Sequence, residues 1–128
     1  MATRKRPDIR FEMDAHDVIV EVDENQHRGY EESCEWPMAA RISEIVGAIG
    51  GKAVVFIRYN PDNVRSNGSR VAVTAAERID LLVATVKEEL ARCNGEFSVR
   101  LVQLWYDSTE PGPYEARRTM DITHVVAV

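Results

Sequence analysis

Two short runs of alternating apolar and polar residues lie near the start of the chain, at residues 8–13 and 18–23. Alternation with a period of two is typical of β-strands that have one apolar face. The residues between the runs, 14–17, are turn-forming, so this segment is predicted to be a β-hairpin. A turn centred on Ala15 and His16 brings the apolar faces together and gathers the acidic residues on the other face. In that register four pairs lie opposite one another: Met13 with Val18, Phe11 with Val20, Arg10 with Glu21, and Asp8 with Asp23.

The rest of the chain alternates between helical and strand patterns. Apolar residues at helical spacing predict a helix over 38–49, and a capping box of Thr74 and Glu77 begins a second helix that ends near Asn94. Residues 53–57 form a continuous apolar run, typical of a central strand covered on both faces. Further strands are predicted at 97–106 and 122–126, and loops at 24–37, 60–69 and 107–120.

These elements predict a single α/β domain over residues 1–128. Its mixed sheet contains the hairpin, the central strand and two C-terminal strands, and the helices pack on it. Because the first helix joins the hairpin to the central strand, a right-handed crossover and a parallel strand pair are expected. The second helix is predicted to bury one apolar stripe against the core, formed by Ile79, Leu82, Val83, Val86 and Leu90.

Composition and charge narrow the function classes. The 128 residues are 45% hydrophobic and 29% charged, which is ordinary for a soluble globular chain. There is no apolar run of about 20 residues and no secretory signal, and Cys34 and Cys93 lack the spacing of metal ligands. We therefore expect an intracellular, soluble protein with reduced thiols, whose compartment, nuclear, viral or other, is left open. The net charge of −5 argues against a generic nucleic-acid binder.

The acidic face of the predicted hairpin carries candidate chemistry. Asp8 and Asp23 are expected as cross-strand neighbours about 4.5–5.5 Å apart at Cβ, with Glu21 beside them. Such a cluster needs a bound cation, a shared proton or a basic partner. One or two carboxylates, with waters and a phosphate, commonly hold magnesium. His27 lies close by in the sequence and has an unperturbed pKa suited to proton transfer near neutrality. The cluster therefore predicts phosphodiester hydrolysis.

A simpler interpretation of the acidic face stays open. It is a solvated sheet surface balanced by Arg10 and Lys5, since an arginine opposite a glutamate is an ordinary cross-strand ion pair. His16 and His124 are expected to have structural roles. Arg41, on the first predicted helix, faces either a phosphate or solvent.

Several segments, taken in order and spacing, resemble a known family. They are residues 6–8 (RPD), 18–27 (VIVEVDENQH), 34–35 (CE) and 54–62 (VVFIRYNPD). They resemble uncharacterised proteins of large DNA viruses and algae whose C-terminal domain looks restriction-endonuclease-like. Those domains are similar to very-short-patch-repair and EDxHD homing endonucleases, within the PD-(D/E)xK superfamily. The resemblance covers residues 6–62, about half of the chain.

The resemblance implies a restriction-endonuclease-like fold and roles for individual residues. It makes Asp8 and Glu21 metal ligands for Mg²⁺ or Mn²⁺, with the main-chain carbonyl of Val22 as a further ligand. It makes His27 the general base. Asp23 stands where the superfamily has its lysine, so it is expected to be an auxiliary acid, and water activation falls to His27 or to the metal. The superfamily core also begins with a helix and a strand before the Pro-Asp motif, which C-terminal elements or a partner subunit would have to replace.

The expected function is a metal-dependent DNA endonuclease. DNA contacts are predicted for Arg6, Arg10, Arg58 and Asn60, although Asn60 and the two residues after it are equally good turn chemistry. The alternative is a nuclease-fold protein without activity that serves as an interaction or regulatory module. The acidic pI, the short N-terminus and the missing lysine favour that alternative. The expected partners are DNA and, left open, a second copy of the chain, but no membrane.

Overall fold

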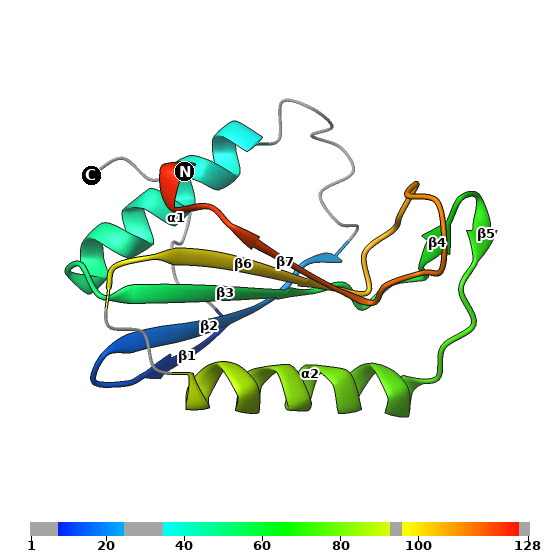
Figure 1. Cartoon of the computed structure of the whole chain (residues 1–128), viewed down its shortest axis with the longest axis horizontal. Coiled ribbons are helices and arrows are strands. Elements are labelled where there is room, and N and C mark those ends of the chain that lie inside the picture. The colour runs from blue at the N-terminus through cyan, green and yellow to red at the C-terminus, as the bar shows by residue number, and fades with distance from the viewer. Residues whose placement is uncertain (1–7, 25–34, 93–95, 126–128) are drawn as a thin grey trace.

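The computed structural model describes residues 8–24, 35–92 and 96–125, and in residues 35–40 and 125 only the backbone (Figure 1). Two helices and a five-stranded sheet make up most of this part of the chain. The helices are α1 (Glu35–Ile49) and α2 (Ala75–Ala91), and a 3₁₀ turn, η3, spans Thr123–Val125. The strands are β1 (Ile9–Glu12), β2 (His16–Val22), β3 (Ala53–Tyr59), β4 (Arg65–Ser66), β5 (Ser69–Arg70), β6 (Val99–Leu104) and β7 (Arg117–Asp121).

The main sheet is mixed and has five strands in the order β1-β2-β3-β6-β7. β2, β3 and β6 are parallel, while β1 and β7 pair antiparallel at the two edges. β4 and β5 form a separate two-stranded hairpin. The predicted α/β class, the parallel pair and the buried central strand are confirmed, because β3 is covered on both faces along most of its length.

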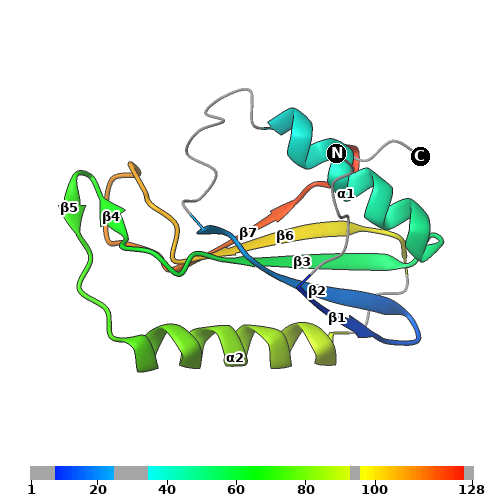
Figure 2. The same ribbon diagram turned by 180° about the vertical axis from the view of Figure 1, so that it is seen from behind.

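The two helices lie on opposite faces of the sheet (Figures 1 and 2). One apolar cluster joins α1 to residues such as Ile19 and Phe56, and the other joins α2 to residues such as Val20 and Ile57. The alternation of side chains along each strand separates the clusters. β2, β3 and β6 are neighbours in this order and parallel, while α1 and α2 lie on opposite faces. The crossover from β2 through α1 to β3 and the crossover from β3 through α2 to β6 therefore have opposite hands. One of the two is the rare left-handed form.

The register of the hairpin differs from the prediction. Ile9 lies opposite Val20 and Phe11 opposite Val18, because the turn is centred on residues 14–15 and not on 15–16. His16 consequently belongs to β2, where it is buried and its Nε2 lies 2.8 Å from the carbonyl oxygen of Glu89 at the end of α2. The change moves every partner by two residues, so each side chain keeps the face that was predicted for it.

The second helix is rotated relative to its predicted apolar stripe. Thr74 and Glu77 form the expected capping box, but Ile79 and Val83 are 48% and 43% exposed. The face toward the sheet is built from residues that include Leu81, Leu82, Thr85, Val86, Glu89 and Leu90. The predicted stripe is therefore wrong for Ile79 and Val83 and confirmed for its other three residues, and the polar Thr85 and Glu89 lie on the buried face.

Three further boundaries are corrected. α1 begins at Glu35 and not at 38, and the segment 60–69, predicted as a loop, contains the hairpin β4–β5. The last strand is β7, which includes residues 117–120 of the predicted loop, while 123–125 form η3 in place of a strand. Within the described residues, the helices are too short or too polar to cross a membrane.

Candidate functional site

The acidic residues predicted as a site lie near the carboxyl end of β2. Glu21 and Asp23 lie on the face covered by α1, at the carboxyl end of β2. Continuing the β1–β2 register by one residue places Asp8 opposite Glu21, on the same face, and not opposite Asp23 as predicted. Directly across from Glu21 on the other side, the parallel register places Arg58 of β3. The carboxyl ends of parallel strands are where α/β sheets commonly bind ligands.

Arginine supplies the counter-charge within this cluster. Glu21 and Asp23 are 4% and 3% exposed, so their charges lie away from bulk water. Arg58 extends between them, with Nη1 3.3 Å from Glu21 Oε1 and Nη2 3.6 Å from Asp23 Oδ1. Arg41 of α1 pairs with the other oxygen of Glu21, and the Tyr106 hydroxyl donates a hydrogen bond to Asp23. The sequence predicted that such a cluster needs a bound cation, a shared proton or a basic partner. The structure shows basic partners, and the Tyr106 hydroxyl adds a hydrogen bond.

The cluster also shifts the pKa values of Arg58 and Tyr106. Burial disfavours the charged form of Arg58, but the neighbouring Asp23, Tyr106 and Glu21 outweigh it, and the pKa of Arg58 is raised. Burial and the hydrogen bond to Asp23 raise the pKa of the Tyr106 hydroxyl. Both groups therefore stay protonated throughout the ordinary pH range: Arg58 remains a cation, and the Tyr106 hydroxyl remains a hydrogen-bond donor.

Asp8 differs from the other two acids because it is exposed. Its Oδ2 accepts a hydrogen bond of 2.7 Å from the main-chain N–H of Val22. Asp8, Glu21 and the carbonyl of Val22 offer hard oxygen donors, which suit Mg²⁺ or Mn²⁺ in chemical type. Larger groups, with three or more His, Cys, Asp or Glu side chains placed to hold a metal, are absent from the described residues. In this structure, however, both carboxylate oxygens of Glu21 are already paired with arginines.

A further buried acid on this face was not singled out from the sequence. Asp17 is completely buried on the same face, where Arg10 Nε and Lys52 Nζ each lie 2.7 Å from one of its oxygens. Arg10 therefore pairs with Asp17 and not with Glu21. The interpretation of the acidic face as solvated and balanced by Arg10 is wrong for Glu21 and Asp23, because both are buried and paired with other arginines.

The remaining predicted residues are placed as follows. Arg6, His27 and Lys5 lie outside the described residues. Asn60 is fully buried: its amide donates to the carbonyl oxygen of Trp105 at 2.8 Å, and its Oδ1 accepts from the N–H of Asp62 at 3.0 Å. These contacts are those of a turn, so they support the turn interpretation of Asn60.

Two contributors to the cluster were missed as such. Arg41 was considered only as a residue facing phosphate or solvent, yet it lies on Glu21. Tyr106 was placed in a regular strand, but β6 ends at Leu104 and the chain leaves it through Trp105, whose φ is +66°. A pattern of apolar residues gives no signal for such a turn, whereas the parallel alignment of two apolar runs does place Arg58 near Glu21.

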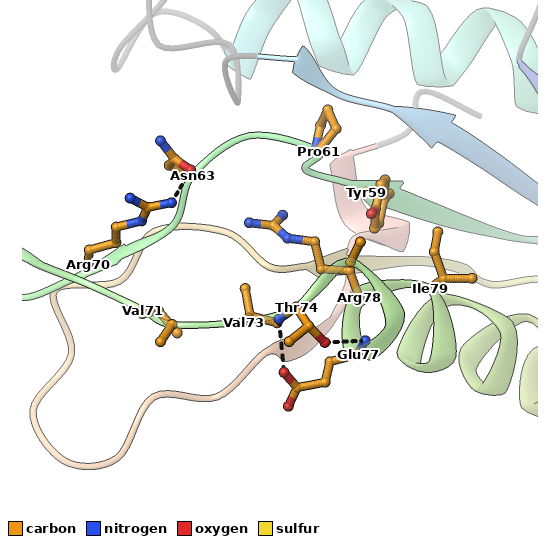
Figure 3. Close-up of a pocket in the computed structure, with 12 residues that line it drawn as sticks. Tyr59, Pro61, Asn63, Arg70, Val71, Val73, Thr74, Glu77, Arg78 and Ile79 are labelled. Carbon is orange, nitrogen blue, oxygen red and sulfur yellow. Dashed lines mark hydrogen bonds between the residues drawn. The ribbon is translucent and has the colours of Figure 1, made fainter.

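A pocket of about 870 Å³ lies on the other face of the sheet, between the end of β3 and the start of α2 (Figure 3). Its wall includes Tyr59, Pro61 and Arg78. The guanidinium of Arg78 is already held, since it donates to the carbonyl oxygens of Asn60 and Asp62 at 2.8 Å each. The acidic residues of the cluster are not part of this pocket.

Comparison with known proteins yields no relative: no family model matches the chain, and neither a curated protein nor a solved structure is significantly similar to it.

Proposed function

We propose that this protein is a metal-dependent DNA endonuclease with a restriction-endonuclease-like core. The observation that supports the proposal is the hydrogen bond from the Val22 N–H to Asp8 Oδ2, which holds the Asp8 carboxylate against β2 one residue from Glu21. These are the two residues expected to bind metal from the resemblance. The order hairpin, helix, parallel strand also agrees with that resemblance, and α2 is a candidate replacement for the helix that the superfamily has before its Pro-Asp motif.

The residues of the cluster would divide the work of hydrolysis. Asp8, Glu21 and the Val22 carbonyl would hold Mg²⁺, which when bound polarises a phosphoryl oxygen and lowers the pKa of water. Arg58 and Tyr106 fix the orientation of Glu21 and Asp23. The water oxygen bonds to phosphorus as the bond from phosphorus to the leaving sugar oxygen breaks.

The protons of this reaction need an acceptor and a donor. The water proton passes to a base, for which His27 remains the expectation from the resemblance, and the leaving oxygen takes a proton from solvent.

Asp8 offers the sharpest test, because its removal should leave the fold intact. Asp8→Asn keeps an oxygen that can accept from the Val22 N–H but removes the charge. We expect it to abolish nicking of supercoiled plasmid in Mg²⁺ or Mn²⁺, with an unchanged melting temperature. Glu12→Gln is the matched control, since it removes a charge from an exposed position of β1 and should leave nicking unchanged. Absence of nicking by the wild-type protein in either metal would exclude the proposal.

The second candidate is a nuclease-fold interaction module without activity. It is favoured by the ion pairs that already neutralise Glu21 and by the net charge of −5, which opposes DNA binding. A melting titration with Mn²⁺ separates the candidates. A bound metal should stabilise the protein by about 2.7 kcal/mol at a concentration 100 times its Kd, whereas a flat response favours the inactive module.

A further inference from the structure

Strand β1 forms one edge of the five-stranded sheet (Figure 2). In the described part of the chain, no strand pairs with its outer side. The Met13 N–H donates to the carbonyl oxygen of His16 at 3.0 Å, so residues 9, 11 and 13 direct their main-chain groups toward β2. The N–H and C=O groups of Arg10 and Glu12 consequently point outward, and an open edge of this kind is a template for another strand.

The two faces of β1 differ in character. Ile9, Phe11 and Met13 share the face that α2 covers, yet Ile9 and Met13 are 50% and 38% exposed. Arg10 and Glu12 share the opposite face, and both are exposed. A strand that pairs with this edge therefore has to offer apolar side chains on one face and complementary charges on the other.

A second copy of β1 meets this requirement in one antiparallel register. When Phe11 lies opposite Phe11 of the other copy on a two-fold axis, Arg10 lies opposite Glu12 and Ile9 lies opposite Met13. The charged pairs are then attractive, and the apolar pairs lie together on the α2 side. The same register brings the outward main-chain groups of Arg10 and Glu12 together as hydrogen-bonded pairs on both sides of the axis.

Other registers of this strand pair are less favourable. A shift by two residues places either Arg10 opposite Arg10 or Glu12 opposite Glu12, and a shift by one residue sets Arg10 opposite Phe11. The existing contact of Arg10 does not prevent the pairing. Its Nε lies 2.7 Å from Asp17, and a guanidinium has five donors, so a second carboxylate can be bound.

We propose that β1 is a self-association edge, through which two copies of the chain pair antiparallel about a two-fold axis at Phe11. The two sheets then form one continuous sheet, with both α2 helices on the same face. The pairing covers residues 9–13, since the next pair would set Asp8 opposite Asp14 of the turn. One short strand pair is a small interface, so the dimer is weak and depends on concentration. The inference does not depend on the proposed function, because each copy carries its own Asp8 and Glu21.

Sedimentation velocity measures this association without any need for activity. The wild type should shift from monomer toward dimer as its concentration rises through about 5–500 µM, a range that suits a weak interface. Glu12→Lys sets a lysine opposite Arg10 on both sides of the axis and should raise the dissociation constant at least about tenfold. Glu115→Lys is the control, because it reverses the same charge at an exposed position of the loop before β7 and should leave the dissociation constant unchanged.

Two cysteine variants test the register. In a background of Cys34→Ser and Cys93→Ser, Ile9→Cys and Met13→Cys each carry one thiol at an exposed position. Positions 9 and 13 of different copies lie opposite one another in the proposed dimer, so copper phenanthroline should oxidise a mixture of the two variants to a disulfide-linked dimer. Neither variant alone should be linked, because equal positions are then four residues apart along the strands. A mixture of Met13→Cys with Glu115→Cys measures linkage by random collision.

Each outcome decides the inference. A wild type that stays monomeric over the whole range overturns it, and so does association that Glu12→Lys leaves unchanged. Linkage of Ile9→Cys or Met13→Cys alone as readily as of their mixture shows that the axis at Phe11 is wrong. Linkage in the mixture only, with weaker association of Glu12→Lys at an unchanged melting temperature, supports the dimer. Plasmid nicking plays no part in these outcomes, so the proposed function is tested separately.

Discussion

Replacing Arg58 by methionine tests whether the buried cluster stabilises the fold. The substitution keeps a long side chain in the core but removes the guanidinium that lies 3.3 Å from Glu21 and 3.6 Å from Asp23. Two carboxylates that are 4% and 3% exposed then lose their shared cation. Breaking a buried pair in this way costs about 3–5 kcal/mol, because the remaining charge cannot be hydrated. At this chain length that corresponds to a fall in melting temperature of roughly 10–20 °C.

Urea denaturation at pH 7 measures the loss, and a second variant isolates its cause. Adding Glu21→Gln and Asp23→Asn to Arg58→Met removes the buried charges together with the cation, so most of the lost stability should return. A free energy of unfolding for Arg58→Met within about 1 kcal/mol of wild type would refute the reasoning. So would a triple variant that is no more stable than Arg58→Met.

Three smaller predictions concern the scaffold. Gly68→Ala should destabilise the protein by about 1–2 kcal/mol in thermal melts, because φ at Gly68 is +86°, although space for the methyl group is open. Hydrogen bonds with the N–H and hydroxyl of Thr74 lower the pKa of Glu77 in the folded protein. The capping interaction therefore stabilises fully above the ordinary glutamate pKa, and its contribution is lost as pH falls through the lowered pKa of the folded state. An NMR titration of Thr74→Ala should find the Glu77 pKa higher than in the wild type. Val86→Ala should cost about 1–3 kcal/mol in urea, whereas Val83→Ala, at an exposed position, should stay within about 0.5 kcal/mol.

The hairpin shows how far the sequence could predict the fold. Period-two alternation predicted which residues share a face, and the assignments are confirmed for the paired residues 9–12 and 17–20. The register was wrong by two residues because it depends on His16, which is buried against the carbonyl of Glu89. That contact joins residues far apart in the chain, so a local pattern could not reveal it. The faces survive because a shift of two residues preserves them.

Other misses had a signal in the sequence that was not used. The dipeptide Asn67-Gly68 between two short polar pairs is a strong hairpin signal, and both residues have positive φ in the turn of β4–β5.

The rotation of α2, in contrast, had no signal in the sequence. It follows from the burial of Thr85 and Glu89, and Glu89 is held by Arg100 of β6. Such a buried pair overrides the apolar stripe.

The candidate site was predictable in its acids and in one of its two cations. Asp8 and Glu21 belong to one hairpin, so local alternation placed them on one face, and the parallel alignment of β2 with β3 places Arg58 beside Glu21. Arg41 comes from α1, whose approach to the hairpin is a property of the tertiary structure. The alternative interpretation, a solvated face, is wrong for Glu21 and Asp23, because both are buried and paired with arginine.

A crystal of the protein soaked in Mn²⁺ tests the metal site most directly. An anomalous difference peak within coordination distance of the carboxylates of Asp8 and Glu21 is the result that the proposed endonuclease predicts. Density with no peak between the two carboxylates at saturating Mn²⁺ would contradict it.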